Sequence, residues 1–369
     1  MEAFFIYTYV ADNFVSMSTR LVINEFIDNV SQQLIIDVRS PAEYFHAHFP
    51  NAINIPLFDN EERKIVGTAY KQKSREDAIK IGLDFFGPKM RKIVEEVEDL
   101  LKDRKEESPN KDYSANSVAI YCWRGGMRSA AIAWLLQLYG FKISVLAGGY
   151  KAYRNYILQI LAYPWNFKVL GGYTGSGKTE LLKSLKNAGE PAIDLEALAV
   201  HKGSAFGNIN LPPQPSQEMF ENNLATELNA YDRQQSIWIE DESQRIGSIN
   251  LPKDFWRILR QSPVYFLDVP FEKRLQHITE EYGPLDRGKI GDAIKRITKR
   301  LGGLETKNAL RFLEEGNLKE CFSILLKYYD KHYLKSLHNR DNLSSLLTNI
   351  NCNEAGGAAI SSLLNQTLA

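Results

Sequence analysis

The stretch Val118-Ala119-Ile120-Tyr121-Cys122-Trp123-Arg124-Gly125-Gly126-Met127-Arg128-Ser129 decides the fold of the first half of the chain. Residues 118–121 are apolar and predict a buried strand. The Ala- and Leu-rich run from Ser129 to Tyr139 predicts a helix that ends at Gly140. Backbone N–H groups and the helix dipole at such a turn favour a bound anion and a thiolate. We therefore predict a nucleophilic sulfur at Cys122, within an anion cradle formed by Arg124, Gly125, Gly126 and Arg128.

The surrounding sequence supports a parallel α/β sheet. Apolar runs at 34–39, 52–57 and 143–146 predict further strands. Residues 60–112 predict a helical insertion, because apolar residues recur at helical spacing at 93, 94, 97, 100 and 101. Strands that alternate with helices are typical of parallel sheets. A buried structural cysteine is the alternative interpretation of Cys122. The agreement of strand, glycines, arginines and following helix favours the reactive site.

A second motif follows, with the sequence Gly172-Tyr173-Thr174-Gly175-Ser176-Gly177-Lys178-Thr179. It lies between an apolar strand at 167–170 and a helix at 180–186, as a phosphate-binding P-loop requires. In such loops the backbone amides hold phosphates, the Lys reaches a terminal phosphate and the Thr can hold Mg²⁺. We predict a diphosphate site made of Gly172, Thr174, Gly175, Ser176, Gly177, Lys178 and Thr179. The motif indicates a phosphate site and not ATP turnover, since a diphosphate other than a nucleotide fits equally well.

The rest of the second half continues the α/β pattern. Strands are predicted at 191–194, 236–240 and 264–268, helices at 217–233 and 254–260, and helical structure from 271 to about 340. Glu240 and Asp241 end one strand, where they either support the phosphate site or are ordinary solvated acids. Six basic residues could neutralise RNA phosphates along one helix, although a solvated helix face is the commoner explanation. They are Arg287, Lys289, Lys295, Arg296, Lys299 and Arg300.

Bulk composition limits the possibilities. The 369 residues suggest two domains, and the net charge of zero excludes a dominant basic nucleic-acid footprint. The three cysteines are too few for a disulfide framework and predict reduced thiols in the cytoplasm. No apolar run reaches the roughly 18 residues of a membrane span. We expect an extension at 1–17, with Met17 as a candidate start. Two α/β domains at 18–155 and 156–349 then follow, and a tail at 350–369.

The first domain resembles the rhodanese family. The resemblance rests on the Cys122 loop, on Asp37-Val38-Arg39-Ser40-Pro41-Ala42-Glu43-Tyr44 and on His48-Phe49-Pro50-Asn51-Ala52-Ile53-Asn54-Ile55-Pro56. Many single-domain sulfurtransferases have four residues between the Cys and the Arg of this loop. Five separate Cys122 from Arg128, as in cysteine phosphatases. The longer loop widens the cradle toward a tetrahedral oxyanion, which favours a phosphate-like donor or a phosphatase over simple thiosulfate transfer.

The two motifs together resemble the bacterial tRNA 2-selenouridine synthase family, as do the stretches 67–71, 201–204 and 240–243. The resemblance implies a rhodanese-like parallel-sheet domain followed by a P-loop NTPase-like α/β domain with a helical C-terminal part. It also implies replacement of sulfur by selenium at the wobble 2-thiouridine of tRNA, using selenophosphate, through S-geranylation by geranyl diphosphate.

The same resemblance implies roles and partners. Cys122 would carry or deliver selenium, Arg124 and Arg128 would bind the donor's phosphate, and the P-loop would hold the prenyl diphosphate. The implied partners are tRNA and a selenophosphate-producing enzyme, without a membrane. No tightly bound cofactor is expected, and Mg²⁺ is an optional one. A small-molecule kinase or cysteine phosphatase with a rhodanese-like domain is the competing interpretation. A third is a tRNA-binding module with degenerate sites, against which the intact Cys122 and Lys178 argue.

Overall fold

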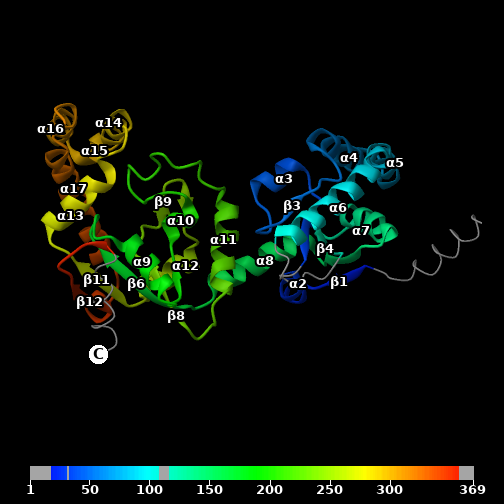
Figure 1. The fold of residues 1–369 in the computed structure, drawn as a ribbon, viewed down its shortest axis with the longest axis horizontal. Helices are drawn as coiled ribbons and strands as arrows, with labels where there is room; N and C mark the ends of the chain where they lie inside the picture. Colours follow the sequence, from blue (N-terminus) through cyan, green and yellow to red (C-terminus); the bar gives the residue numbers. More distant parts are fainter. Residues whose placement is uncertain (1–17, 31–32, 108–115, 357–369) are drawn as a thin grey trace, which may run out of the picture. The chain divides into compact units, whose positions relative to one another are not determined.

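The computed structural model describes residues 18–30, 33–107 and 116–356. The predicted extension at 1–17, the last residues (108–112) of the predicted insertion and most of the tail at 350–369 lie outside these residues. The chain divides between Gln159 and Ile160 into two compact units, each built on a parallel sheet (Figure 1). This confirms the predicted α/β class.

The first unit contains a five-stranded sheet with the order β1-β5-β4-β2-β3, and all neighbouring strands are parallel. Its strands are β1 (Thr19–Leu21), β2 (Leu34–Asp37), β3 (Ile53–Asn54), β4 (Ser117–Tyr121) and β5 (Lys142–Leu146). The central strands β2 and β4 are buried along their whole length, which explains why their sequences are apolar except for Asp37 and Ser117 at their ends. Strand β3 is shorter than the predicted 52–57.

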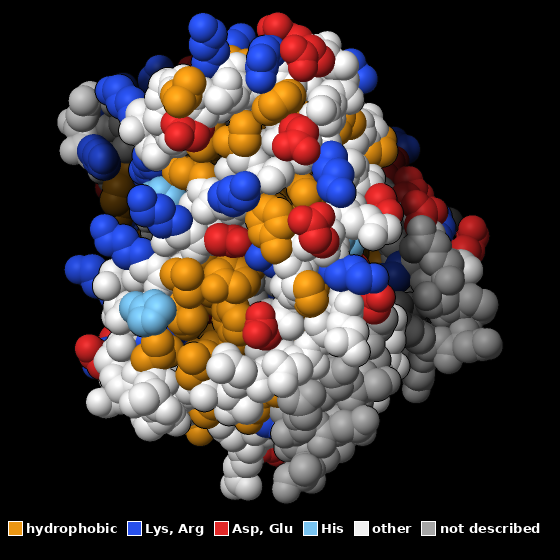
Figure 2. All heavy atoms as spheres, turned by 90° about the vertical axis from the view of Figure 1, so that its left-hand side faces the viewer, with side chains coloured by type: hydrophobic (Ala, Val, Ile, Leu, Met, Phe, Trp, Pro, Cys, Tyr) orange, Lys and Arg blue, Asp and Glu red, His pale blue; other side chains and the backbone are white. Residues whose placement is uncertain are grey.

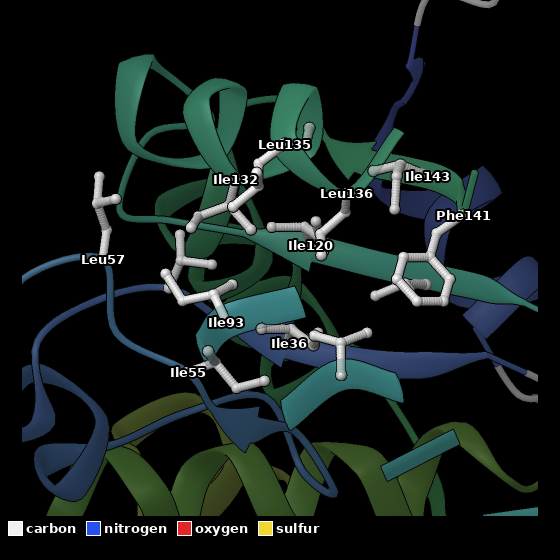
Figure 3. Packing of buried hydrophobic residues seen from close by; sticks show 14 of the residues in the cluster. Ile36, Ile55, Leu57, Ile93, Ile120, Ile132, Leu135, Leu136, Phe141 and Ile143 are labelled. Atoms are coloured by element: carbon white, nitrogen blue, oxygen red, sulfur yellow. The ribbon is translucent and has the colours of Figure 1, made fainter. Parts of the chain in front are cut away.

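Helices cover this sheet. They are α2 (Ile23–Val30), α3 (Pro41–His46), α4 (Asn60–Gln72), α5 (Arg75–Phe86), the short 3₁₀ helix Gly87–Lys89, α6 (Met90–Glu107), α7 (Met127–Tyr139) and α8 (Gly149–Ala162). Helices α4, α5 and α6 lie within the predicted insertion at 60–112, of which the structure describes 60–107. Figure 3 shows Ile93 of α6 and Ile132 of α7 in the same core as Ile36 and Ile120 of the central strands. Packing against this core fixes both ends of the Cys122 loop.

The second unit contains another five-stranded parallel sheet, with the order β12-β11-β6-β8-β7. Its strands are β6 (Asn166–Gly172), β7 (Ala192–Ile193), β8 (Ser236–Glu240), β11 (Val264–Asp268) and β12 (Leu347–Asn351), with a small antiparallel pair β9 (Arg245–Ile246) and β10 (Ile249–Asn250). Its helices are α9 (Lys178–Asn187), α10 (Leu195–Ala199), α11 (Gln217–Asn229), α12 (Lys253–Gln261), α13 (Phe271–Tyr282), α14 (Arg287–Arg296), α15 (Thr298–Leu301), α16 (Gly303–Glu314), α17 (Leu318–His338) and α18 (Leu343–Leu346).

Strand β12 was not indicated by the sequence pattern. Its sequence Leu-Thr-Asn-Ile-Asn buries only Ile350, because the strand lies at the sheet edge. Main-chain pairing with β11 over five residues holds it in place, and such pairing is independent of side-chain type. The edge strand β1 likewise has mostly exposed residues, so that no apolar run in the sequence marks it as a strand.

Among the helices of the described residues, none combines the length and apolar character needed to cross a membrane.

Candidate functional site

Cys122 lies where β4 ends and the loop to α7 begins, as predicted. Its side chain is 3% exposed. The sulfur is 3.3 Å from the hydroxyl oxygen of Ser129, and the N–H of Gly126 donates to it across 3.4 Å. The loop thus surrounds the sulfur with hydrogen-bond donors at the N-terminus of a 13-residue helix.

These donors shift the Cys122 thiol toward its charged form. Burial is the largest single influence and opposes ionisation. The hydrogen bond with Ser129, the positive charge of Arg128 and the backbone N–H groups of Ser129 and Arg124 together outweigh it, so that the pKa of Cys122 is lowered. A thiolate is the reactive form of cysteine. The prediction of an activated sulfur at this position therefore agrees with its surroundings.

Arg128 is held beside the cysteine by Glu43, a residue that no local sequence signal marks as part of the site. The guanidinium donates to both carboxylate oxygens, Nη1 to Oε2 across 2.7 Å and Nη2 to Oε1 across 3.2 Å. The N–H of Ser40 also donates to this carboxylate. Burial opposes ionisation of Glu43, but these contacts lower its pKa. Glu43 therefore anchors Arg128 as a carboxylate, whereas the side chain of Arg124 is exposed.

The close approach of Gly149 to the Cys122 loop suggests a stability test. Gly149 has φ +59°, and a Cβ there would lie 2.2 Å from the carbonyl oxygen of Cys122. We expect Gly149→Ala to lower the free energy of unfolding by about 2 kcal/mol or more, from strain and steric overlap together. Gly87→Ala is the control, because Gly87 has helical φ and ψ and open space around it. Urea unfolding measures the free energy of unfolding of both variants. Equal values would show that the Cys122 loop can move to accommodate the added Cβ without cost.

The second motif forms the loop between β6 and α9, the position that the sequence predicts for it. Gly175 and Gly177 have positive φ angles of 81° and 74°. The ammonium group of Lys178 donates to the carbonyl oxygen of Gly172 across 3.1 Å. Ser176 is fully buried, and both its hydroxyl and its backbone N–H donate to the carbonyl oxygen of Tyr173, so that this residue stabilises the turn of the loop.

A cavity of about 730 Å³ opens beside this loop. One part of its wall is polar and carries Lys178 and Thr179. Another part is aromatic, from Tyr282 of α13 and from Tyr328 and Tyr329 of α17. The loop at 201–204 also borders it. The cavity can therefore accept a ligand with a charged end and an apolar body.

An acidic cluster adjoins Lys178. Glu240 is 1% exposed and accepts a hydrogen bond from the backbone N–H of Glu196 across 2.7 Å. Thr179 donates to Glu196 Oε2 across 3.4 Å. Burial, reinforced by the neighbouring carboxylates, raises the pKa of Glu196 to about 7 and raises those of Glu240 and Glu242 well above normal. Glu196 was missed in the sequence because it lies outside the phosphate loop and joins it only in the fold.

Asp241 has a different role from its neighbours. Tyr333 donates to its Oδ2 across 2.8 Å, and Arg340 forms an ion pair with its other oxygen. Tyr333 in turn accepts from the N–H of Gly172 across 3.1 Å. Asp241 therefore connects α17 to the start of the phosphate loop. Within the described residues no group of three or more His, Cys, Asp or Glu side chains is arranged to hold a metal ion.

The charge of Glu196 predicts a pH-dependent phosphate site. As pH rises through about 7, the pKa of Glu196, its carboxyl becomes negative beside Lys178 and repels an anion. Without divalent metal, we expect inorganic diphosphate to bind several-fold more weakly at pH ~8 than at pH ~6. In Glu196→Gln this part of the pH dependence should be absent. Calorimetric titration measures the binding of diphosphate to both proteins, and the difference between their pH profiles is free of the ionisation of diphosphate itself, which is the same in both titrations. Identical pH profiles would contradict the assignment.

The predicted basic stripe does not follow one helix. Helix α14 ends at Arg296, Ile297 leaves helical geometry with ψ 5°, and Lys299 and Arg300 belong to α15. Arg296 donates to the carbonyl of Ala205 across 2.8 Å, and Arg300 borders the cavity. The side chain of Lys289 donates to Asn210 across 2.8 Å. Figure 2 looks onto the side of the molecule on which α14 and α15 lie in Figure 1. It shows Lys and Arg side chains along one side of this face, beside a hydrophobic area.

Each half of the chain matches a known protein family. The rhodanese-like domain family matches residues 22–156, and the family described as tRNA 2-selenouridine synthase AAA domain matches residues 165–351. A tRNA 2-selenouridine synthase of Bdellovibrio bacteriovorus is 34% identical, over 88% of this chain and 94% of its own. A tRNA 2-selenouridine synthase of Hydrogenovibrio crunogenus is 37% identical, over 76% of this chain and 79% of its own. One of Shewanella denitrificans is 36% identical, over 85% of each chain. The chain therefore belongs to the tRNA 2-selenouridine synthase family, a family of enzymes.

Proposed function

We propose that this chain replaces the sulfur of wobble 2-thiouridine in tRNA by selenium, in two steps that use its two sites. The observation that carries the proposal is the presence in one chain of an activated thiol at Cys122 and a phosphate loop at Lys178 that opens into a part-aromatic cavity. Relatives of matching length are named for the synthesis of 2-selenouridine in tRNA.

The first step takes place at the phosphate loop with geranyl diphosphate. The thiocarbonyl sulfur of the base attacks the first carbon of the geranyl group, and a carbon–sulfur bond forms. Diphosphate leaves with the electron pair of the broken carbon–oxygen bond, and the base releases its N3 proton to water. Lys178 and the loop amides stabilise the departing charge. Tyr282, Tyr328 and Tyr329 supply the apolar wall against which the geranyl chain packs.

The second step takes place at Cys122 with selenophosphate as the selenium source. A selenium nucleophile adds to C2 of the base, and the geranylated sulfur leaves as geranylthiol. Alkylation makes this departure easier, because a thiol is a better leaving group than the sulfur of the original thiocarbonyl. Arg128, fixed by Glu43, and Arg124 bind the phosphate of the donor.

Mg²⁺ fits the phosphate site as an optional partner. Thr179 and Glu196, whose side-chain oxygens lie 3.4 Å apart, are the groups that would hold it. When bound it would neutralise diphosphate charge, and it would favour the ionised form of Glu196.

Reconstitution tests the proposed function. The protein is incubated with tRNA that carries wobble 2-thiouridine, then with geranyl diphosphate, and finally with selenophosphate, and the nucleosides are analysed by mass spectrometry. We expect S-geranyl-2-thiouridine after the second addition and 2-selenouridine after the third. Unchanged 2-thiouridine throughout, together with ATP hydrolysis in the absence of RNA, would instead indicate a kinase.

A further inference from the structure

The Cys122 loop has the features of a site that accepts a phosphoryl group. Five residues separate Cys122 from Arg128, and Ser129 follows directly. The Arg128 guanidinium is oriented by its two hydrogen bonds to Glu43. Gly125, with φ +62°, lets the loop turn so closely that a Cβ there would meet the carbonyl oxygen of Leu146 at 2.5 Å. The sulfur, the backbone N–H of Gly126 and the Arg128 guanidinium thus belong to one short loop, the set of groups that recognises a tetrahedral anion.

Electron balance decides which atom of selenophosphate the thiolate can attack. If the sulfur attacked selenium, the selenium–phosphorus bond would break with its electron pair on phosphorus. Phosphorus would then leave at the oxidation level of phosphite, and selenium on Cys122 would be oxidised. If the sulfur attacks phosphorus, selenium leaves as hydroselenide with the electron pair. No oxidation state changes, and hydroselenide is the nucleophile that C2 of the base requires.

We propose that Cys122 is a phosphoryl acceptor: its thiolate attacks the phosphorus of selenophosphate, releases hydroselenide, and forms S-phosphocysteine, which water then hydrolyses to phosphate. This inference rests on the proposed use of selenophosphate. It assigns the selenium to the tRNA base directly, without a selenium adduct on the protein. In the hydrolysis, the oxygen of water bonds to phosphorus, and the electron pair of the sulfur–phosphorus bond returns to Cys122.

The charge state of Glu43 restricts the leaving group. Glu43 contacts the loop through Arg128, which donates to both of its carboxylate oxygens. Its lowered pKa keeps it ionised, so it has no proton to give. The site therefore suits leaving groups that depart as stable anions, such as hydroselenide or hydrosulfide. Alkyl phosphates, whose alkoxide needs a proton from a general acid, should react poorly.

Ser129 is placed to assist the second half of this reaction. Its hydroxyl oxygen is 3.3 Å from the sulfur and 3.0 Å from the carbonyl oxygen of Gly126, and its single proton can turn to either. Donation to the sulfur stabilises the thiolate that leaves when water attacks S-phosphocysteine. Ser129 thus acts on hydrolysis of the intermediate more than on its formation, and loss of the hydroxyl should make the intermediate accumulate.

The test uses the full-length protein with inorganic thiophosphate or selenophosphate under anaerobic conditions, without RNA. After a rapid acid quench, peptide mass spectrometry examines Cys122, and ³¹P NMR identifies the phosphorus product. We expect a phosphoryl adduct on Cys122, more abundant by at least several-fold in Ser129→Ala than in the wild type, and phosphate as product. Ser129→Thr keeps a hydroxyl and should restore turnover.

The outcomes separate this inference from the proposed function. A selenium or sulfur adduct on Cys122, or phosphite as product, would overturn the phosphoryl-acceptor role while selenouridine formation still stood. Normal turnover with no phosphoryl adduct in the quenched wild type would overturn it equally, whether or not Ser129→Ala folds. Failure of geranylated tRNA to gain selenium from selenophosphate would instead remove the proposed function.

Discussion

Cys122→Ala is expected to abolish 2-selenouridine formation and to leave S-geranylation at the wild-type rate, so that geranylated tRNA accumulates. Loss of a catalytic nucleophile costs on the order of 10³-fold or more in rate. Geranylation should continue, because the proposed geranyl diphosphate site at Lys178 is built from the second unit alone. Nucleoside mass spectrometry after reaction with both donors measures the two products separately.

Cys352→Ser is the matched control for this experiment. Cys352 is also 3% exposed, and its sulfur donates to the carbonyl of Ile350, a contact that a serine hydroxyl can keep. Burial, followed by the charge of Asp268, raises the pKa of Cys352, the opposite of the shift at Cys122. We expect this variant to make selenouridine normally. Selenouridine formation by Cys122→Ala at the wild-type rate would rule out any chemical role for Cys122.

The positions of the Cys122 loop and the Lys178 loop between a strand and a helix could be predicted, because each motif is contained in a few consecutive residues. The spacing of Cys122 and Arg128, and that of Gly172 and Lys178, specify a strand, a tight turn and a helix without help from distant parts of the chain. The fold class followed from the same alternation. Buried central strands such as β4 were predicted well, since burial on both faces imposes an apolar sequence.

The partners of these loops could not be predicted, because they come from distant positions. Glu43 meets Arg128 across 85 positions of sequence, and Tyr333 meets Asp241 across 92. Charged residues of this kind are common on surfaces, so nothing local marks them as site residues. The end of helix α14 before Ile297 also could not be predicted from the local sequence. The periodicity of the basic residues continues through it while the backbone changes direction.

Lys178→Ala is expected to reduce S-geranylation by about 10²- to 10³-fold, the cost of removing one group that stabilises developing negative charge. Selenouridine formation from 2-thiouridine should fall with it, because the geranylated base is its substrate. Lys186→Ala is the control: Lys186 lies on the same helix, is exposed and pairs with Glu227 across 3.5 Å. Its geranylation rate should match that of the wild type.

Supplying tRNA that is already geranylated gives the decisive arm of the Lys178→Ala experiment. If the two sites perform separate steps, this variant converts such tRNA to 2-selenouridine at the wild-type rate, whereas Cys122→Ala does not. The two variants would then complement each other when mixed with 2-thiouridine tRNA and both donors. If Lys178→Ala also fails on geranylated tRNA, the phosphate loop takes part in selenium transfer itself, and the division of labour between the sites is wrong. Intact geranylation in Lys178→Ala would instead place the prenyl diphosphate elsewhere on the protein.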